Sequence, residues 1–222
     1  MTDPRLPASS PCFAAEIDPA HVDPDQARDV ARWRKAERQR LLADRAAMAV
    51  EDRQIASHAI ADRLDRLLAD RFATLQGLTI SAWWPMKAEL NLRSWLTGLA
   101  ARGAQAALPI VATKGAPLIF RAWTPDTRME RGFWSIPVPA EGPEVVPDIT
   151  LAPVVGWDTA FCRLGYGGGY FDRTLAALSP RPFAVGVGLE AAHIPTIFPQ
   201  PYDIPMQAIV TESRILTGTN AA

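Results

Sequence analysis

The stretch Ile149-Thr-Leu-Ala-Pro-Val-Val155 is the strongest indication of the fold class. It continues as Gly156-Trp-Asp-Thr-Ala-Phe-Cys-Arg-Leu-Gly-Tyr-Gly-Gly-Gly-Tyr-Phe-Asp-Arg173. The first part is a short apolar run of the kind that forms a buried strand. A glycine-rich loop follows, and the residues after it predict a helix over Tyr170–Leu178. A strand, a loop and a helix in this order are typical of a parallel sheet that is covered by helices.

The rest of the chain repeats this alternation. Apolar runs predict five further strands, over Leu78–Trp84, Ala106–Val111, Leu118–Trp123, Phe183–Val187 and Ala208–Thr211. The spacing of apolar residues predicts three further helices, over Asp25–Met48, Glu51–Asp70 and Leu90–Ala101. We therefore expect a three-layer α/β/α fold with an open, largely parallel sheet and an N-terminal helical pair.

Three segments of this pattern need their own interpretation. His58 falls on the apolar stripe of the second helix, where a packed histidine is expected rather than a catalytic one. The stretch Thr124–Pro147 is rich in proline and glycine, which favours an excursion from the sheet over a separate domain. Residues 1–24 contain five prolines and predict a flexible arm. Residues 25–222 are then expected to form a single α/β catalytic domain.

The composition limits the class of protein. The net charge is −1, so neither a nucleic-acid-binding protein nor a polybasic membrane-surface protein is expected. No apolar run reaches the roughly 18 residues of a spanning helix, and the N-terminus lacks the basic start and apolar core of a secretory signal. Cys12 and Cys162 do not have a metal-type spacing. A reduced, cytoplasmic setting is therefore expected.

The glycine-rich loop carries the chemistry. Ligands of open parallel sheets gather at the carboxyl ends of the strands, and this loop follows such an end. Backbone amides can approach an anion at four glycines, Gly165, Gly167, Gly168 and Gly169. The N-terminus of the following helix adds a field that favours phosphate. Arg163 and Arg173 can pair with phosphate oxygens, and Asp172 can hold a hydrated magnesium ion.

Two common phosphate-binding motifs do not describe this loop. It lacks the Gly-Lys-Ser/Thr ending of a Walker A sequence, and Tyr170 stands where a dinucleotide fingerprint has its third glycine. A run of glycines can also be a flexible turn without a ligand. The arginines, the aspartate and the aromatic residues around the loop favour a binding site.

The run Arg163-Leu-Gly-Tyr-Gly-Gly-Gly-Tyr-Phe-Asp172 resembles the signature of the 5-formyltetrahydrofolate cyclo-ligase family, which is essentially Arg-Leu-Gly-x-Gly-x-Gly-Tyr-aromatic-Asp. Further pieces are similar to the family in the expected order: the basic pair Arg34 and Arg38, Trp84–Glu89, Ser135–Pro139 and Tyr202–Glu212. The resemblance extends over about residues 32–212, nearly the whole chain except the proline-rich arm.

The resemblance implies ATP- and magnesium-dependent cyclisation of 5-formyltetrahydrofolate to 5,10-methenyltetrahydrofolate, with release of ADP and phosphate. The implied catalytic residues are Arg163, Tyr170 and Asp172. The implied ATP-binding residues are Arg34, Lys35, Arg38, Arg163, Leu164, Gly165, Tyr166, Gly167, Gly168, Gly169, Tyr170 and Phe171. The implied folate-binding residues are Trp84, Glu89, Tyr166, Gly167, Gly168, Gly169 and Tyr170. The implied magnesium ligands are Asp172 and Asp203.

The side chains outside the loop have structural alternatives. The carboxylate of Glu89 can accept two hydrogen bonds from the aminopyrimidinone edge of a pterin, or it can cap the helix that follows. Trp84 can form an apolar wall for the ring, or it can belong to the core. Arg34 and Arg38 lie one helical turn apart and can clamp phosphates, and Lys35 is a possible substitute for one of them. Alternatively, these residues lie on a solvated face of the helix. Asp203 can also serve as a turn residue.

Three positions depart from the family pattern. Many members have a glycine at the position of Phe161, a glutamine near His193, and an acid in the segment that is Ser135–Pro139 here. Phe161 is expected to pack against apolar neighbours such as Trp157, which would leave the site open; the alternative is that its ring crowds the nucleotide entrance and reduces activity. Two other functions remain: a family paralogue with another substrate, for example in thiamine-related salvage, and a non-catalytic regulator that binds nucleotide or folate. A monomer is expected, with ATP and a folate as its small-molecule partners.

Overall fold

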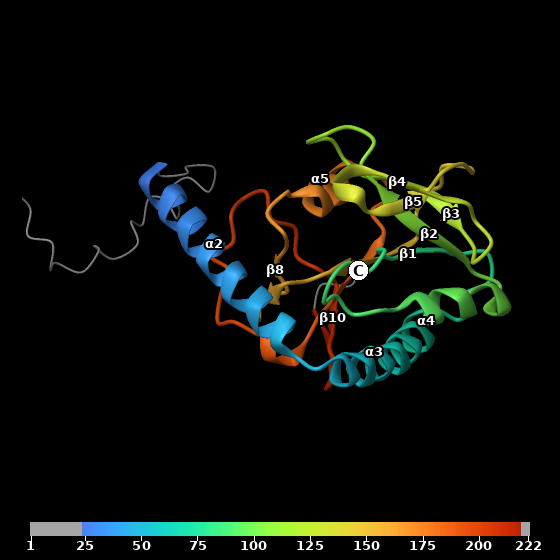
Figure 1. Ribbon diagram of the computed structural model, residues 1–222, viewed down its shortest axis with the longest axis horizontal. Helices are drawn as coiled ribbons and strands as arrows, with labels where there is room; N and C mark the ends of the chain where they lie inside the picture. Colours follow the sequence, from blue (N-terminus) through green and yellow to red (C-terminus); the bar gives the residue numbers. More distant parts are fainter. Residues whose placement is uncertain (1–23, 219–222) are drawn as a thin grey trace, which may run out of the picture.

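The computed structural model describes residues 24–218 (Figure 1). Within this range the helices are α2 (Pro24–Ala47), α3 (Val50–Arg71), α4 (Arg93–Gly98) and α5 (Tyr170–Ala177), with the short 3-10 helices η1 (Ala100–Arg102), η2 (Phe133–Ser135) and η3 (Glu190–Ala192). The predicted arm, residues 1–24, lies outside the described residues except for Pro24, which begins α2. No helix in the described range is both long enough and apolar enough to cross a membrane.

The central sheet is open and largely parallel, as predicted. Its described strands, in spatial order, are β11 (Ile215–Thr217), β10 (Ala208–Val210), β9 (Phe183–Val187), β6 (Ile149–Pro153), β1 (Thr79–Ser81), β2 (Gln105–Ile110) and β3 (Ile119–Trp123). The strands from β10 to β2 run parallel, whereas the edge strands β11 and β3 are antiparallel to their neighbours. Each edge strand follows its neighbour after a short turn, and a short turn can join only antiparallel strands.

Helices cover both faces of this sheet. Side chains alternate along each strand between two apolar clusters. In β6, Leu151 belongs to the cluster that contains Leu64 of α3, and Ala152 belongs to the cluster that contains Leu175 of α5. Figure 1 shows α3 and α4 on one side of the sheet and α5 on the other. The predicted three-layer α/β/α arrangement is therefore confirmed, and α2 and α3 form the N-terminal helical pair.

The buried face of α3 differs from the predicted stripe. Its buried side chains are Ala56, Ser57, Ile60, Leu64, Leu67 and Leu68, at spacings that share one helix face. His58 lies two positions after Ala56, about 200° around the helix axis, and it is exposed. Ile55 is also 67% exposed. The prediction that His58 is packed is therefore wrong, because the buried stripe runs along another face.

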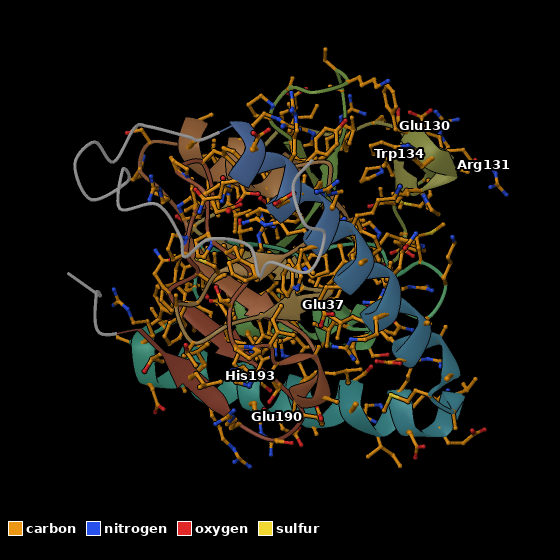
Figure 2. All side chains as sticks on the ribbon, turned by 90° about the vertical axis from the view of Figure 1, so that its left-hand side faces the viewer. Glu37, Glu130, Arg131, Trp134, Glu190 and His193 are labelled. Carbon is orange, nitrogen blue, oxygen red and sulfur yellow. The ribbon has the colours of Figure 1, made fainter. Side chains whose placement is uncertain are left out.

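The stretch Thr124–Pro147 contains a short hairpin, β4 (Met129–Arg131) and β5 (Pro137–Pro139). Arg121 of β3 ties this hairpin to the sheet, because its Nη1 donates to the carbonyl oxygens of Pro139 (3.1 Å) and Ala140 (3.2 Å). At the turn of the hairpin, Trp134 has a φ of +55° and is 61% exposed. Figure 2 shows Trp134 close to Glu130 and Arg131 at the edge of the molecule.

The connection from β6 to β9 carries the glycine-rich loop. After β6 the chain forms a small hairpin, β7 (Gly156–Trp157) and β8 (Arg163–Leu164), and then the loop over residues 165–169. Helix α5 follows and returns the chain to β9, which is parallel to β6. This crossover places the loop beyond the carboxyl end of β6, where the sequence predicts it.

Candidate functional site

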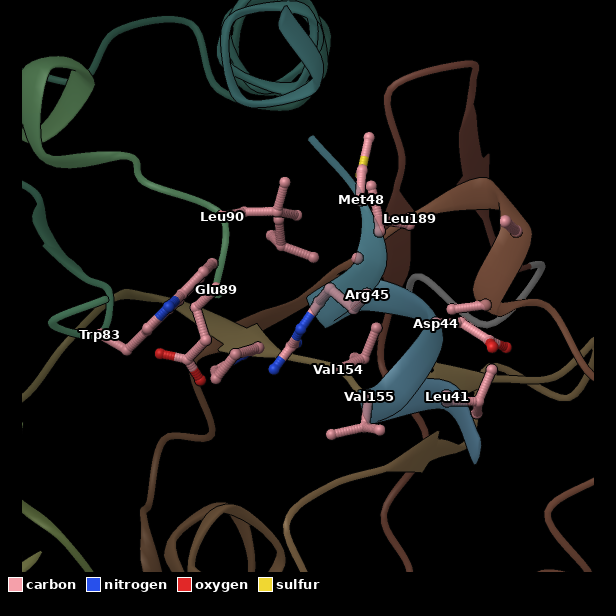
Figure 3. A pocket seen from close by; sticks show the side chains of 15 residues that line it. Leu41, Asp44, Arg45, Met48, Trp83, Glu89, Leu90, Val154, Val155 and Leu189 are labelled. Atoms are coloured by element: carbon pink, nitrogen blue, oxygen red, sulfur yellow. The ribbon is translucent and has the colours of Figure 1, made fainter. Parts of the chain in front are cut away.

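A cavity of about 280 Å³ opens at the carboxyl ends of the central parallel strands. Its walls come from α2 and from the segments that follow β1, β6 and β9, and they include Leu41, Arg45, Trp83, Glu89, Val154, Val155, Gly188 and Leu189. Figure 3 shows Arg45 reaching across the cavity toward Trp83 and Glu89. Ligands of open α/β sheets bind at this edge, so the cavity is the candidate site.

One face of α2 carries the basic residues that reach the site. Arg34, Arg38, Leu41 and Arg45 follow one another at spacings of three or four residues and so share a face. Lys35 lies one position off this face and is exposed, so the structure does not bring the predicted Lys35 to the loop. Arg45 is a residue that the sequence analysis missed, although its spacing from Arg38 and Leu41 is a signal for it.

Two arginines of α2 hold the glycine-rich loop. Arg38 donates from Nε to the carbonyl oxygen of Gly165 (2.6 Å), and Arg45 donates from Nη2 to the hydroxyl of Tyr166 (2.5 Å). Gly167 has a φ of +93°, and a Cβ there would lie 3.3 Å from Cζ of Arg38. A side chain at Gly167 would therefore be both strained and crowded. The glycine is needed because the guanidinium lies directly against the backbone.

Arg34 joins α2 to the turn around Asp203. It donates from Nε to the carbonyl oxygen of Ile197 (2.8 Å) and from Nη2 to that of Phe198 (2.9 Å). It also forms an ion pair with Asp203, and the two side chains are only 13% and 9% exposed. Asp203 further accepts from the amide of Gln200 (2.7 Å). Arg34 is therefore both a structural clamp and a positive charge near the loop.

Arg163 and Asp172, which flank the loop, form a buried ion pair. Arg163 Nη2 and Asp172 Oδ2 lie 2.9 Å apart, and the side chains are 4% and 16% exposed. The other carboxylate oxygen of Asp172 accepts from the amide of Ile204 (3.3 Å). Burial lowers the pKa of Arg163, although Asp172 opposes this change. Within the described range, Nε of Arg163 is buried without a hydrogen-bond partner.

Asp172 and Asp203, the predicted magnesium ligands, are each paired with an arginine. Burial lowers the pKa of Arg163, and the negative charges of Asp172 and Asp203 both oppose this change. Residues 24–218 contain no group of three or more His, Cys, Asp or Glu side chains that could hold a metal ion. Carboxylates that are already paired with arginines can accept hydrogen bonds from the waters around a magnesium ion that is itself bound to substrate phosphates. They do not fit a resident ion held by protein ligands alone.

The loop leads into α5 with its backbone accessible. Tyr166, Gly167 and Gly168 are exposed. Gly169 has a φ of +62° and is the N-cap residue of α5. Arg173 folds back from the first turn and donates from Nη2 to the carbonyl oxygen of Gly168. Exposed amides at a helix N-terminus suit an anion such as phosphate.

Glu89 lies in the cavity wall. Its Oε1 accepts a hydrogen bond from the hydroxyl of Tyr166, and its Oε2 accepts one from the amide of Met86 (2.7 Å). Burial raises the pKa of Glu89, and these two hydrogen bonds only partly oppose the change. Trp83 lies beside Glu89 (Figure 3), and its Nε1 is buried without a hydrogen-bond partner among the described residues. This end of the cavity therefore offers both an acceptor and a donor.

The structure brings Trp83, rather than the predicted Trp84, to the cavity. The ring of Trp84 packs edge-on against Trp123, with 6.3 Å between ring centroids, and the guanidinium of Arg93 lies 4.4 Å from the centroid of Trp84. Neighbouring residues of an extended segment point to opposite sides. The sequence alone does not show which of two adjacent tryptophans faces the cavity.

Tyr170, Phe171 and Leu164 serve mainly in packing. The hydroxyl of Tyr170 accepts from the amide of Gly115 (3.2 Å), and its ring meets Trp134 edge-on, with 5.6 Å between centroids. Phe171 packs against two apolar clusters, and Leu164 is buried in one of them. Tyr170 thus lies toward the turn between β2 and β3, apart from Glu89. The exposed Trp134 beside it was missed, because nothing in a Pro- and Gly-rich stretch marks its position.

The two departures at Phe161 and His193 lie outside the cavity. His193 is exposed, its ring lies 4.5 Å from that of Trp157, and Figure 2 shows it close to Glu190. Phe161 has a φ of +61° and packs against the apolar cluster that contains Trp157. The ring of Phe161 therefore packs as expected and is not part of the cavity wall.

The site thus has two parts with different chemistry. The exposed loop amides, α5 and the arginines of α2 suit a ligand that carries several negative charges. The cavity around Glu89 is largely apolar and suits a flat ligand with adjacent N–H donors. Tyr166 contacts Glu89 from the loop, so the two parts adjoin.

Comparisons with known proteins agree with this geometry. The sequence model of the 5-formyltetrahydrofolate cyclo-ligase family matches residues 30–212. The 5-formyltetrahydrofolate cyclo-ligase of Mycolicibacterium smegmatis is 28% identical over 148 residues, covering 63% of this chain and 76% of that protein. The enzyme of the same name from Haemophilus influenzae is 27% identical over 141 residues, covering 59% and 74%.

Solved structures share the fold. The 5,10-methenyltetrahydrofolate synthetase of Aquifex aeolicus has a TM-score of 0.70 at 24% identity, covering 85% of this chain and 94% of that chain. The enzyme of the same name from Mycoplasma pneumoniae has a TM-score of 0.64 at 21% identity, covering 81% and 98%. Because the family match spans α2, the cavity and the glycine-rich loop, the chain belongs to the 5-formyltetrahydrofolate cyclo-ligase family.

Proposed function

We propose that this protein is a 5-formyltetrahydrofolate cyclo-ligase that uses ATP and magnesium to make 5,10-methenyltetrahydrofolate, ADP and phosphate. The observation that carries the proposal is the contact between Tyr166 of the glycine-rich loop and Glu89 of the cavity. An acceptor for a pterin edge and a phosphate-binding loop then lie one side chain apart. Phosphoryl transfer from ATP to a folate requires that proximity. Membership of the family supports the same reaction.

The phosphates of ATP would bind over the glycine-rich loop. Exposed amides at Gly167 and Gly168 precede the N-terminus of α5, which favours negative charge. Burial lowers the pKa of Arg38, and the positive charge of Arg34 adds to this effect. An anion that binds between the loop and α2 would relieve that repulsion. Arg38 and the loop therefore form the core of the proposed nucleotide subsite.

Magnesium would enter as part of the ATP substrate. Asp172 and Asp203 would accept hydrogen bonds from the waters of the ion while they remain paired with Arg163 and Arg34. The ion supplies positive charge that neutralises the phosphates. The arginines would then act mainly in orienting the nucleotide.

The pterin ring of the folate would occupy the cavity. Its aminopyrimidinone edge has adjacent N–H donors that match the two carboxylate oxygens of Glu89. Trp83, Val154 and Leu189 in the cavity wall would provide apolar contact. With that edge held at Glu89, the ring would lie next to the loop, because Tyr166 of the loop contacts Glu89.

The reaction would then proceed in two steps. The formyl oxygen attacks the γ-phosphorus, the bond from this phosphorus to the bridging oxygen breaks, and ADP leaves. N10 attacks the formyl carbon, phosphate leaves with the former formyl oxygen, and N10 loses its proton. The loop amides and Arg163 would stabilise charge on the transferring phosphoryl group.

The test is turnover of the purified protein with MgATP and 5-formyltetrahydrofolate. The absorbance of the methenyl product should appear, and ADP should form only when the folate is present. Arg38→Ala should lower turnover by roughly a hundredfold, whereas Arg40→Ala, which changes a more exposed arginine of the same helix, should leave it near wild type. Product formation without ATP, or ADP formation that ignores the folate, would contradict the proposal.

A further inference from the structure

Tyr166 links three parts of the site that are distant in sequence. Its hydroxyl accepts from Nη2 of Arg45 on α2 (2.5 Å) and donates to Oε1 of Glu89. The guanidinium of Arg45 also lies 5.8 Å from the centroid of the tyrosine ring. A phenol has one hydrogen to donate, and in the described structure Glu89 takes it.

The position of Tyr166 in the loop connects this contact to the nucleotide subsite. Tyr166 stands between Gly165, whose carbonyl oxygen is held by Arg38 (2.6 Å), and Gly167, whose φ is +93°. Glycines on both sides allow the backbone at Tyr166 to rotate at little cost. The carbonyl group that Arg38 binds belongs to the peptide unit between Gly165 and Tyr166, so a backbone rotation at Tyr166 changes that contact.

The same contact conflicts with folate binding at Glu89. Oε2 of Glu89 is already engaged by the amide of Met86 (2.7 Å) and Oε1 by Tyr166. A bidentate ligand must approach both oxygens, and the hydroxyl of Tyr166 would compete with it at Oε1. Tyr166 is 50% exposed, so it has space to move outward.

We propose that Tyr166 is a latch whose hydroxyl occupies Glu89 in the free protein, and that folate binding displaces it and frees the glycine-rich loop for ATP. This inference rests on the proposed function of the site. Displacement of Tyr166 releases Arg45, which donates to its hydroxyl, to turn toward an anionic ligand. Folate should then strengthen nucleotide binding, and nucleotide should strengthen folate binding by the same factor.

Tyr166→Phe tests the latch because it keeps the ring and removes the hydroxyl. Dissociation constants are measured by calorimetry for 5-formyltetrahydrofolate and for the non-hydrolysable analogue adenosine β,γ-imidotriphosphate with magnesium, each alone and with the other ligand saturating. In the wild type, each ligand should tighten the other by about fivefold or more. In the variant, folate alone should bind about two- to tenfold more tightly, because one hydrogen bond no longer competes. The factor by which each ligand tightens the binding of the other should fall toward one.

Tyr202→Phe is the matched control, since it makes the same chemical change at a side chain that is 67% exposed. It should reproduce the wild-type constants, and the thermal melts of both variants should be cooperative. If Tyr166→Phe weakens folate binding or leaves the mutual tightening intact, the latch is wrong. If the wild type fails to bind the folate or the nucleotide at all, the proposed function is wrong, and the two failures are therefore distinguishable.

Discussion

Phe161 holds a backbone conformation that suits glycine. Its φ is +61°, its amide donates to the carbonyl oxygen of Asp158 (3.0 Å), and its own carbonyl oxygen accepts from the amide of Met206 (2.9 Å). The turn is therefore fixed from both sides. The left-handed region costs a residue with a Cβ about 1–2 kcal/mol, and packing of the half-buried ring offsets this cost.

Phe161→Gly should remove strain and packing together. We expect the free energy of unfolding to fall by about 1–2 kcal/mol, because the lost contacts outweigh the relieved strain. Turnover should change by less than about tenfold, since the ring lies outside the cavity wall. Phe161→Ala is the control: it loses the ring but keeps the strain, so it should be less stable than Phe161→Gly by about 1 kcal/mol. Urea denaturation and steady-state kinetics measure both effects. A much more active glycine variant would mean that the ring blocks the site.

The ion pair between Arg163 and Asp172 allows structure and catalysis to be separated. Breaking a buried pair from one side costs about 3–5 kcal/mol, whereas removing both charges costs much less. Arg163→Met and Asp172→Asn should each destabilise the protein strongly, and the double variant should be more stable than the sum of the single effects predicts. Turnover should stay at least a hundredfold below wild type in all three variants. If turnover returns along with stability in the double variant, the pair has only a structural role.

At the scale of elements, α2 is the part of the site that is most easily detached. It lies beside the layered core in Figure 1 and carries Arg38 and Arg45 to the loop. Leu41 anchors it: this side chain is 4% exposed, and its Cδ1 would lie 2.7 Å from a Cβ at Gly156. Leu41 therefore helps to position these arginines, together with Trp33 and Leu42, which pack against the same apolar cluster.

Leu41→Ala should loosen α2 and weaken nucleotide binding. A buried Leu→Ala change costs about 2–5 kcal/mol, and here the loss should appear as faster amide hydrogen exchange along α2 and as a raised KM for ATP. Leu68→Ala is the control, because Leu68 is fully buried on α3 and its loss should lower stability without raising the KM for ATP. Equal effects of the two variants on KM would show that α2 is not a separate functional element.

The elements that the sequence predicts best are those with long apolar runs. Each of the six predicted strands overlaps an observed strand, because buried parallel strands need continuous apolar sequence. The hairpins β4–β5 and β7–β8 and the edge strand β11 were not predicted. Their strands have only two or three residues. The strands β1 and β10 are equally short, but they lie inside the predicted apolar runs Leu78–Trp84 and Ala208–Thr211.

In the candidate site too, the residues that were predicted are those with a local sequence pattern. The loop and the pair Arg34 and Arg38 are recognisable, because each is a local pattern in the sequence. Arg45 and Trp83 reach the cavity only through the packing of α2 and of the segment after β1, and no local pattern records that packing. The ion pairs of Asp172 and Asp203 with arginines are also long-range contacts.

At the scale of the whole molecule, the site joins α2, the segment after β1 and the glycine-rich loop. The bonds that connect them run from Arg38 to Gly165, from Arg45 to Tyr166, and from Tyr166 to Glu89. A ligand that contacts all three segments stabilises the folded protein by mass action, by about 2.7 kcal/mol at a hundred times its Kd. The increase in the free energy of unfolding that each ligand causes therefore measures binding at the subsite of that ligand.

Glu89→Gln should change the pH dependence of the stability of the free molecule. Burial raises the pKa of Glu89 above its usual 4.5, so the folded state holds this proton more tightly than the unfolded chain does. Wild-type stability is then lost as the pH rises from the usual pKa toward the folded one. Glutamine does not titrate. The free energy of unfolding of the variant minus that of the wild type should therefore increase between about pH 4.5 and about pH 8. Urea denaturation of both proteins at the two pH values measures this difference, and a difference that decreases with pH would contradict the burial argument.

The same variant should lose the thermal stabilisation that folate gives and keep the stabilisation that the nucleotide analogue gives. The amide of glutamine presents an N–H group where the pterin edge presents its own donors, and an unpaired buried donor costs about 1–3 kcal/mol. Folate at a fixed excess should raise the melting temperature of the wild type but raise that of Glu89→Gln far less. The magnesium complex of adenosine β,γ-imidotriphosphate should raise both by similar amounts, because the loop and α2 are unchanged. Loss of both responses would give Glu89 a structural role, and retention of the folate response would place the pterin elsewhere. Only the split outcome fits a molecule in which one carboxylate serves the folate and a separate loop serves the nucleotide.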